Sequence, residues 1–327
     1  MVEVKGRIAP SPTGDLHLGH AFAFLVAWWN ARSQGGKIVL RIEDIDGVRV
    51  HSSYIKSILY DLQWLGISWD GPPIIQSMRK QTLVNAAFEI LELEKAYPCV
   101  CSRRDLSRDA AQLLSNNPSE NNVSSAPQQG VREIPYPGTC KDKFLDVKSA
   151  EKHSRAEAGI RLKTPEGWVE FNDLNYGVQK IDVKNQVGDF LILRRNKTPA
   201  YQLAIVVDDQ MDQVTEVVRG RDLIDSTARQ ILVAEAFNYS IPAYLHLPLI
   251  CDQDGKRLAK RDDALSLERL RSQGVTKEAI VAWAARSAGQ VTPGEEISAS
   301  KVLQSYQRTL LPREDIILPE NSFSLFE

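Results

Sequence analysis

The sequence lacks the long apolar runs of a membrane protein. No stretch approaches the roughly 20 consecutive apolar residues that a membrane-spanning helix needs. The N-terminus, MVEVKGRIAPSPTG, has no basic segment followed by an apolar one, so no secretory signal is visible. A cytoplasmic location without a membrane partner follows as the expectation.

An excess of positive charge is also missing. Lys and Arg together number 40, Asp and Glu 42, and the formal net charge is -2. This balance gives no general attraction to nucleic acid, so an RNA partner would have to meet a local basic patch. With 43% hydrophobic and 25% charged residues over 327 positions, the composition otherwise suits one large or two modest globular domains.

Cysteine is scarce, with Cys99, Cys101, Cys140 and Cys251 as the whole set. In a reducing compartment a disulfide framework is not expected. The first three lie in one region, and three thiolates suit a structural Zn²⁺ ion, which demands tetrahedral ligands. His153 is a generic candidate for the fourth ligand. The alternative is a set of reduced, unliganded cysteines in a loop.

The N-terminal part has the order of an α/β fold. VKGRIA at 4–9 and KIVLRIED at 37–44 are predicted strands. The apolar segment HLGHAFAFLVAWWNARSQGG between them is a predicted helix that two glycines close. Residues 51–66 and 78–96 have apolar positions at helical spacing. This order predicts a parallel sheet with helices on its faces.

The pattern changes further along the chain. Residues 97–142 hold the cysteines and a polar tract at 115–129, SNNPSENNVSSAPQQ, which has almost no core-forming residues and is expected to be mobile. Residues 159–219 carry short strand-like runs: GIRLK, WVEFND, DFLILRR, YQLAIVV and VTEVVRG. A helix is predicted from Ser226 to Asn238, and a loop followed by two or three helices after Asp254.

The segment PSPTGDLHLGH has the features of a phosphate site. His17 and His20 share one face at the start of the predicted helix, where free N–H groups and the helix dipole favour an anion. Gly19 would let a flat ring such as adenine approach the backbone closely. These features favour a triphosphate site. The alternative is a pair of capping or surface histidines on an ordinary helix.

A second basic segment lies far downstream, in DQDGKRLAKRDDA. It places Lys256, Arg257, Lys260 and Arg261 in a glycine-containing loop. Cations in such a loop could bind phosphates as negative charge builds on a leaving pyrophosphate. The alternative is a solvated basic loop, the usual role of a short charge run.

Together these two segments resemble the signatures of class I aminoacyl-tRNA synthetases, HLGH the HIGH motif and RLAKR a variant of the KMSKS loop. The flanking segments GRIAPSPTGDLHLGHA, LRIEDID, YQLAIVVDD and EVVRGRDL are similar to the glutamyl branch, in that family's order. The resemblance implies a Rossmann-like catalytic core that uses ATP with Mg²⁺. It assigns ATP binding to His17, Gly19, His20, Arg257 and Lys260, and catalysis to His17, His20 and Lys260.

An amino acid with an acidic side chain needs two cation sites and one anion site, and arginine binds a carboxylate through two parallel hydrogen bonds. By similarity to the glutamyl family, glutamate is bound near predicted strand ends, where ligands gather in open α/β sheets, by Arg7, Ser11, Glu43, Tyr201 and Arg219. The alternative is a structural ion pair between Arg7 and Glu43. Asp208 and Asp209 are expected to fix loops or to contact the tRNA end.

The resemblance also bears on the cysteines. Glutamyl-Q tRNA(Asp) synthetases have a zinc site of the form Cys-x-Cys…Tyr-x-x-x-Cys, and Cys99, Cys101, Tyr136 and Cys140 match it. The implied group is one structural Zn²⁺ ion with Tyr136 as its fourth ligand. The tract 108–130 would then loop out of the zinc-binding region. The stretch RGRDLIDSTARQ is also similar to this branch.

The implied activity follows from what comes after the RLAKR loop. The chain ends at Glu327, which leaves no room for the long helical anticodon-binding region of an ordinary glutamyl-tRNA synthetase. The resemblance then implies that a monomer activates L-glutamate to glutamyl-adenylate and transfers it to queuosine at the wobble position of tRNA(Asp). One alternative is a truncated glutamyl-tRNA synthetase that charges a 3′ end. Another is a non-catalytic paralogue that binds RNA, which Ala259 favours because KMSKS has serine there.

The same resemblance divides the chain into four regions. Residues 1–96 form the first half of the Rossmann-like catalytic domain. Residues 97–195 form an inserted, acceptor-like subdomain with the zinc site. The second half of the catalytic domain, with the KMSKS-like loop, covers 196–262. A short helical region at 263–327 follows.

Overall fold

The computed structural model of the protein describes residues 3–45, 50–102, 104–105, 135–258, 265–291, 297–321 and 325–326. The polar tract expected at 115–129 lies outside these residues, and so do Lys260 and Ala259 of the RLAKR segment. Within the described ranges, no helix combines the length and the apolar character that crossing a bilayer requires.

Parallel strands form the N-terminal part of the fold, as the sequence predicted. One sheet has the order β1 (Lys5–Ile8), β2 (Lys37–Ile42), β3 (Ile74–Ile75). Helix α1 (Leu18–Arg32) connects β1 to β2, and α2 (Ser52–Trp64) and α3 (Lys80–Glu92) follow. From its second residue on, β2 is buried on both faces, which explains why it reads as a nearly continuous apolar run.

A second sheet continues beside the first. Its order is β7 (Gly177–Ile181), β6 (Val169–Asp173), β10 (Ala243–Leu247), β9 (Glu216–Gly220). Strand β10 is parallel to both β9 and β6, whereas β6 and β7 form an antiparallel hairpin. The two sheets meet where the amide of Lys5 donates to Thr215 Oγ1 over 2.8 Å and the amide of Thr215 donates to the Lys5 carbonyl over 2.9 Å. Strands β1 and β9 are therefore neighbours at the centre of the fold.

Two helices of the second half pack against each other, α7 (Tyr201–Met211) and α8 (Ile224–Phe237). The prediction of a helix at 226–238 is confirmed. The prediction that YQLAIVV is a strand is wrong, because this segment begins α7. Every residue from Gln202 to Asp209 is buried. A helix buried on all sides shows no apolar and polar periodicity, so its sequence resembles that of a buried strand.

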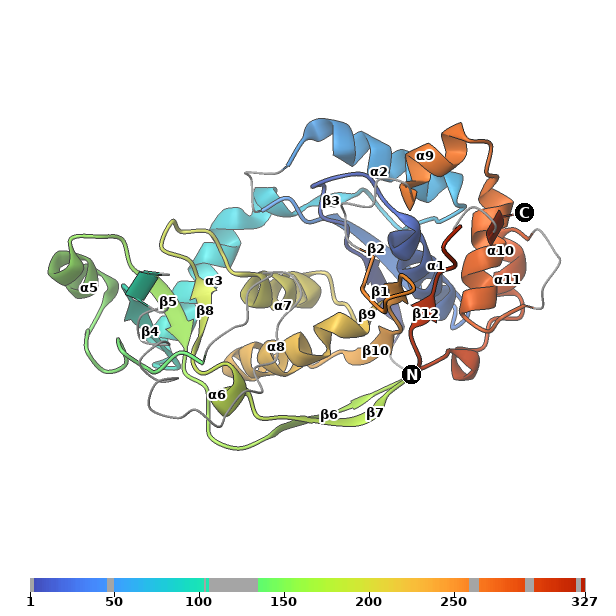
Figure 1. Cartoon of the computed structure of the whole chain (residues 1–327). Coiled ribbons are helices and arrows are strands. Elements are labelled where there is room, and N and C mark those ends of the chain that lie inside the picture. Colours follow the sequence, from blue (N-terminus) through green and yellow to red (C-terminus); the bar gives the residue numbers. More distant parts are fainter. Residues whose placement is uncertain are drawn as a thin grey trace.

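The segment between the two halves forms a small antiparallel sheet with the order β4 (Ala96–Cys99), β5 (Gly159–Leu162), β8 (Phe190–Leu193). It also contains α5 (Val147–Ser154) and α6 (Val183–Gln186). Figure 1 shows this sheet and α5 at the opposite end of the molecule from the C-terminal helices. The strands predicted in GIRLK, WVEFND and DFLILRR are confirmed as β5, β6 and β8, while the four-region division of the chain stays a prediction.

The C-terminal helices belong to the same core as the parallel sheet. They are α9 (Leu267–Ser272), α10 (Lys277–Ser287) and α11 (Ala299–Leu303), in agreement with the two or three predicted. Helix α10 packs on α1, with the Phe22 and Trp283 rings 6.2 Å apart, and Trp29 Nε1 donates to the Ala299 carbonyl over 2.9 Å. The chain then returns to the centre, where β12 (Ile316–Ile317) pairs in parallel with β11 (Ile250–Cys251).

Candidate active site

Charged residues gather where the parallel strands end. Arg7 lies in β1, Arg219 in β9, and Glu43 directly follows β2. Tyr201 is the first residue of α7, and Ser11 is exposed in the turn after β1. Burial raises the pKa of the Tyr201 phenol, and the charges of Arg219, Glu43 and Arg7 also influence it. The fold therefore brings these four buried or half-buried groups into one electrostatic neighbourhood, at the junction of the two sheets.

Arg219 is a buried cation that neutral groups hold. Its Nε donates to His246 Nε2 over 3.1 Å, one terminal nitrogen donates to Gln230 Oε1 over 2.8 Å, and the other donates to Thr227 Oγ1 over 2.7 Å. The guanidinium also lies 5.3 Å from the centre of the Tyr244 ring. Within the described part of the chain, Arg219 has no carboxylate partner. A buried charge without a counterion is costly, so the arrangement suits an anionic ligand.

Arg7 also retains binding capacity. Its Nε lies 3.4 Å from Asp209 Oδ1 yet makes no hydrogen bond to any described residue, and it is buried. One terminal nitrogen donates to the Val218 carbonyl over a long 3.4 Å. A buried donor without a hydrogen bond needs an explanation, and a ligand acceptor would supply one.

The ion pair between Arg7 and Glu43, the alternative raised by the sequence, is not what the structure shows. The carboxylate of Glu43 instead lies 3.4 Å from a terminal nitrogen of Arg41. Burial raises the pKa of Glu43 to about 7, although Arg41 and Arg7 oppose this shift. Near neutral pH this carboxyl group is therefore poised between its two protonation states.

A buried ion-pair network supports this end of the sheet, and no sequence pattern predicted its centre, Arg41. Arg41 is fully buried and donates to Asp209 over 2.7 Å and to Asp212 over 2.8 Å. Arg79 donates to Asp208 over 2.8 Å and to Asp212 over 2.7 Å. Arg79 ends the 3₁₀ helix η1 (Gln76–Arg79), so Asp208 joins α7 to this short helix. Asp209 instead joins a strand residue, Arg41, to Arg7.

The two histidines of HLGH lie at the N-terminus of α1, as predicted. His17 is the N-cap residue, and its Nδ1 accepts from the Gly19 amide over 3.1 Å. His20 Nδ1 accepts from the His17 amide over 3.2 Å, and the two rings are 3.8 Å apart. A Cβ atom on Gly19 would lie 3.1 Å from the His17 ring, so this glycine makes room for the histidine. Capping is thus a real role of this pair, and nucleotide binding stays a prediction.

Both described flanks of the RLAKR loop meet this helix end. Before the loop, Ile250 lies near Gly19, and Cys251 pairs with Arg257 in an antiparallel bridge. After the loop, Ser266 forms a bridge with His17. The fold therefore joins the two motifs that are remote in sequence. Arg257 itself forms an ion pair with Asp222, next to the strand end that carries Arg219.

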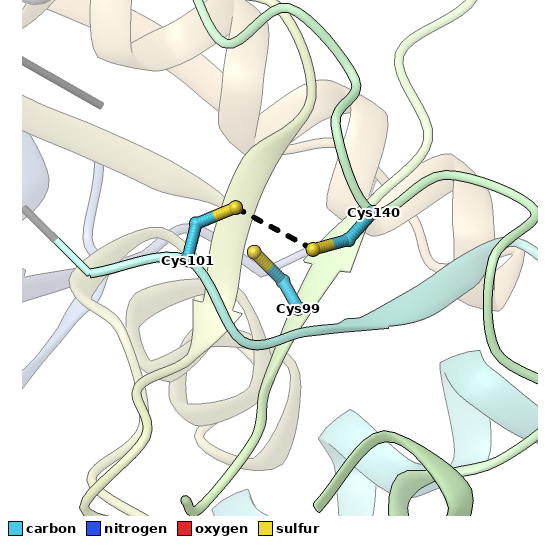
Figure 2. Close-up of side chains that lie close together, drawn as sticks. All are labelled: Cys99, Cys101 and Cys140. Carbon is cyan, nitrogen blue, oxygen red and sulfur yellow. Dashed lines mark hydrogen bonds between the residues drawn. The ribbon is translucent and has the colours of Figure 1, made fainter. Parts of the chain in front are cut away.

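Three cysteine side chains converge beside the small antiparallel sheet. Figure 2 shows Cys99 at the end of β4, Cys101 just after it and Cys140 from a separate loop, with their sulfur atoms turned toward one another. All three sulfur atoms lie within 4.8 Å of one another, and those of Cys101 and Cys140 are 3.4 Å apart. Among the described His, Cys, Asp and Glu residues, this is the one group that could hold a metal ion.

The phenol group of Tyr136 lies beside the three cysteines. Its phenol oxygen lies 3.4 Å from the Cys101 sulfur and 3.6 Å from the Cys99 sulfur. Arg161 donates to the Cys99 sulfur over 3.2 Å. Hydrogen bonds from Cys101 and Cys140, together with the positive charge of Arg161, lower the pKa of Cys99, which favours the thiolate that metals bind. His153 instead packs its ring against Phe144.

Comparison with known proteins identifies the family. The tRNA synthetases class I (E and Q) catalytic domain matches residues 3–314. A glutamyl-Q tRNA(Asp) synthetase of Nitratidesulfovibrio vulgaris is 37% identical over 324 residues, which cover 97% of this chain and 96% of that protein. One from Symbiobacterium thermophilum is 37% identical over 328 residues, covering 98% and 97% of the two chains. The chain belongs to the glutamyl-Q tRNA(Asp) synthetase family. The resemblance inferred from the motifs is thereby confirmed.

A solved structure supports the fold of this synthetase family member. The glutamate tRNA ligase from Elizabethkingia meningosepticum, solved in complex with its amino acid, matches with a TM-score of 0.82 at 24% identity. The match covers 99% of this chain and 68% of that one. The expected α/β fold of a class I synthetase catalytic core is confirmed.

The residues around Arg219 were missed in the sequence. Register places His246 of β10 opposite Arg219 of β9, and Gln230 and Thr227 come from α8. The segment AYLHLPL reads as a buried strand with one polar interruption. The signal that could have found His246 is that single histidine in an apolar strand, since a buried imidazole needs hydrogen-bond partners.

Proposed function

We propose that the protein activates L-glutamate with ATP and transfers the glutamyl group to the queuosine base at the wobble position of tRNA(Asp). The observation that carries this proposal is the buried guanidinium of Arg219, which lacks a carboxylate partner among the described residues and lies at the junction of the two sheets. Open parallel sheets bind ligands at such junctions. Membership in the glutamyl-Q tRNA(Asp) synthetase family supplies the reaction and the acceptor.

In this proposal the site binds each charge of glutamate with an opposite charge. Arg7 and Arg219 bind the carboxylates, Glu43 binds the ammonium group, and Tyr201 and Ser11 contribute neutral hydrogen bonds. Arginine suits a carboxylate because two of its N–H groups match the two oxygens. The unbonded Nε of Arg7 and the neutral surroundings of Arg219 support these roles.

ATP would bind beside the N-terminus of α1, where the positive end of the helix dipole favours phosphate. His17, Gly19, His20, Arg257 and Lys260 are the proposed contacts, and Mg²⁺ would accompany the phosphates as part of the substrate. A glutamate carboxylate oxygen attacks the α-phosphorus, the bond to the bridging oxygen breaks, and pyrophosphate leaves. A hydroxyl of the queuosine cyclopentene-diol then attacks the glutamyl carbonyl, and AMP leaves. In the structure the Arg257 guanidinium forms an ion pair with Asp222.

The decisive experiment separates activation from transfer. Glutamate-dependent exchange of labelled pyrophosphate into ATP is expected without tRNA, and labelled glutamate is expected on queuosine-containing tRNA(Asp) after removal of its 3′-terminal nucleotides. His20→Ala is expected to abolish the exchange. Label that disappears with the 3′ nucleotides would instead indicate an ordinary glutamyl-tRNA synthetase. Failure to form any adenylate would indicate a paralogue that only binds RNA.

We further infer that the cysteine group holds one structural Zn²⁺ ion, with Tyr136 as fourth ligand. Zinc–sulfur bonds of about 2.3 Å in a tetrahedron place sulfur atoms about 3.8 Å apart, close to the spacing between Cys101 and Cys140. The phenol oxygen of Tyr136 lies within 3.6 Å of the sulfur atoms of both Cys99 and Cys101. When bound, the ion would join the end of β4 to the loop that carries Cys140.

Replacing Cys101 by serine is expected to lower the zinc content of the purified protein from about one ion per chain to near zero, because a hydroxyl is a poor substitute for a thiolate. Elemental analysis after dialysis measures this loss. Cys251→Ser is the matched control, since Cys251 lies in β11 away from the cluster, and it should keep its zinc. Tyr136→Phe is expected to weaken retention against a chelator. Full retention in the Phe variant would remove Tyr136 from the ligand set.

The protonation of Glu43 should appear in the pH dependence of glutamate use. Its pKa of about 7 means that the carboxylate needed for the ammonium group is lost as pH falls through neutrality. We expect kcat/KM for glutamate, measured by pyrophosphate exchange at saturating ATP, to fall about tenfold per pH unit below pH 7 and to level off above it. The Glu43→Gln variant should have a low kcat/KM even at high pH, and its kcat/KM should not change slope near pH 7. A wild-type profile that is flat between about pH 6 and pH 8 would contradict the role of Glu43.

A further inference from the structure

A buried histidine connects Arg219 to a carboxylate that does not itself touch the arginine. His246 Nε2 lies 3.1 Å from Arg219 Nε, and His246 Nδ1 lies 2.6 Å from Asp173 Oδ2. His246 is 0% exposed and Asp173 2%. The imidazole lies between the arginine and the carboxylate because its strand, β10, lies between β9, which carries Arg219, and β6, which ends at Asp173.

The protonation state of His246 follows from its two neighbours. The Nε of an arginine can only donate, so His246 Nε2 must be the acceptor, and the single ring proton must lie on Nδ1. Asp173, as an ionised carboxylate, accepts a hydrogen bond from this N–H group. Burial lowers the pKa of His246 to about 4, with Asp173 opposing the shift and Arg219 adding to it, so the ring is neutral at neutral pH. The pair therefore keeps one tautomer and adds no positive charge beside Arg219.

The backbone holds the Asp173 carboxylate in turn. Its Oδ1 accepts from the amides of Asn175 over 3.0 Å and Tyr176 over 2.9 Å, and Oδ2 accepts from the His246 amide over 3.1 Å. Because these amides belong to the turn after β6 and to β10, neither the carboxylate nor the ring can rotate freely. The backbone thus orients Asp173, Asp173 orients His246, and His246 orients the Arg219 guanidinium.

We propose that Asp173 and His246 act as a positioning pair, which sets the tautomer of His246 and thereby aims the Arg219 guanidinium at a substrate carboxylate. The inference rests on the proposed function, in which Arg219 binds glutamate. Neither residue needs to touch the substrate. The pair supplies an acceptor to the Nε of Arg219 and leaves the positive charge uncompensated, whereas a carboxylate in the place of the imidazole would neutralise that charge.

Asp173→Asn tests the tautomer with almost no change in shape. Asparagine has one oxygen, which the amides of Asn175 and Tyr176 would retain, so its NH₂ group would face His246 Nδ1. The ring proton would then move to Nε2, where its N–H group would face the Nε–H group of Arg219, and the hydrogen bond between them would be lost. We expect the KM for glutamate to rise about 10- to 100-fold while the KM for ATP changes little, because only the group that binds glutamate loses its orientation. In the double variant Asp173→Asn with His246→Gln, the glutamine oxygen can again accept from Arg219, and the KM should partly recover.

The tautomer is also measurable without any activity. Long-range proton–nitrogen NMR correlations distinguish protonated from unprotonated ring nitrogens. The chain has only five histidines, so His246→Gln identifies the signals of His246. We expect an unprotonated Nε2 in the wild type and a protonated Nε2 in Asp173→Asn. A wild-type proton on Nε2 would overturn the positioning pair, and so would an unchanged KM for glutamate in Asp173→Asn.

These outcomes separate the inference from the proposed function. A wild-type protein without glutamate-dependent exchange would end the proposed function, and the NMR measurement would still decide whether Asp173 sets the tautomer. Normal exchange in the wild type together with an unaffected Asp173→Asn variant would end the inference alone. A rise in the KM values for glutamate and ATP by the same factor would indicate a merely structural role and would also count against the pair.

Discussion

Replacing Arg219 by methionine is expected to reduce kcat/KM for glutamate roughly 10²- to 10⁴-fold. Two hydrogen bonds between charged groups contribute about 1.5–3 kcal/mol each, and their loss accounts for a decrease of this size. Methionine has a similar length and is neutral, so it removes the charge without leaving a large cavity. Pyrophosphate exchange at varied glutamate concentration measures the effect. The KM for ATP should stay nearly constant, because Arg219 lies on the glutamate side of the proposed site.

A matched control comes from Arg195, which donates to the carbonyl of Glu157 on the surface. Arg195→Met removes the same charge and should leave glutamate use within about twofold of the wild type. If Arg219→Met retained kcat/KM within the same range, Arg219 would not bind a substrate carboxylate. Loss of glutamate use together with normal unfolding by urea would support a direct role in binding.

Replacing Arg41 by methionine is expected to lower the free energy of unfolding by about 3–5 kcal/mol. Arg41 is fully buried, and burial lowers its pKa, but Asp209, Glu43 and Asp208 more than offset this and raise the pKa above its ordinary value. Removing the guanidinium would break the ion pairs of Arg41 with Asp209 and Asp212 and would leave both carboxylates buried without it. Breaking a buried pair from one side is costly for this reason.

Urea unfolding followed by circular dichroism measures this loss as a lower midpoint with an unchanged slope. Arg79→Met is the matched comparison, because Arg79 pairs with Asp208 and Asp212 and is 20% exposed. Water can solvate part of the charge that remains, so the loss should be smaller than for Arg41→Met. Equal midpoints for the wild type and Arg41→Met would show that the network contributes no net stability.

The sequence patterns predicted the first βαβ unit, and the resemblance to the glutamyl family supplied the two arginines of the proposed glutamate site, whose role stays a prediction. This worked because β2 is a short, largely apolar strand and α1 begins at a recognisable HLGH segment. The motifs that contain Arg7, Glu43 and Arg219 follow one another along the chain in the order of the glutamyl family. Their convergence depends on β1 and β9 lying side by side, which no local pattern reveals.

The supporting groups could not be predicted from local sequence. The interactions of Arg41 with Asp209 and of Arg219 with His246 join segments far apart in the chain. Helix α7 was mistaken for a strand because burial on every side removes the periodicity that identifies a helix. Burial of charge is decided by the packing of several elements at once, so it becomes visible only in three dimensions.

The pairing of β12 with β11 has a consequence for the order of events during protein synthesis. Strand β11 leads into the RLAKR loop, and a ribosome adds its partner, Ile316–Ile317, only after this loop and helices α9 to α11. Folding during translation proceeds from the N-terminus, so the parallel sheet can assemble while this partner is still being made. The base of the loop is completed only after β12 has left the ribosome, and a nascent chain should therefore remain unable to consume nucleotide until this strand has been translated.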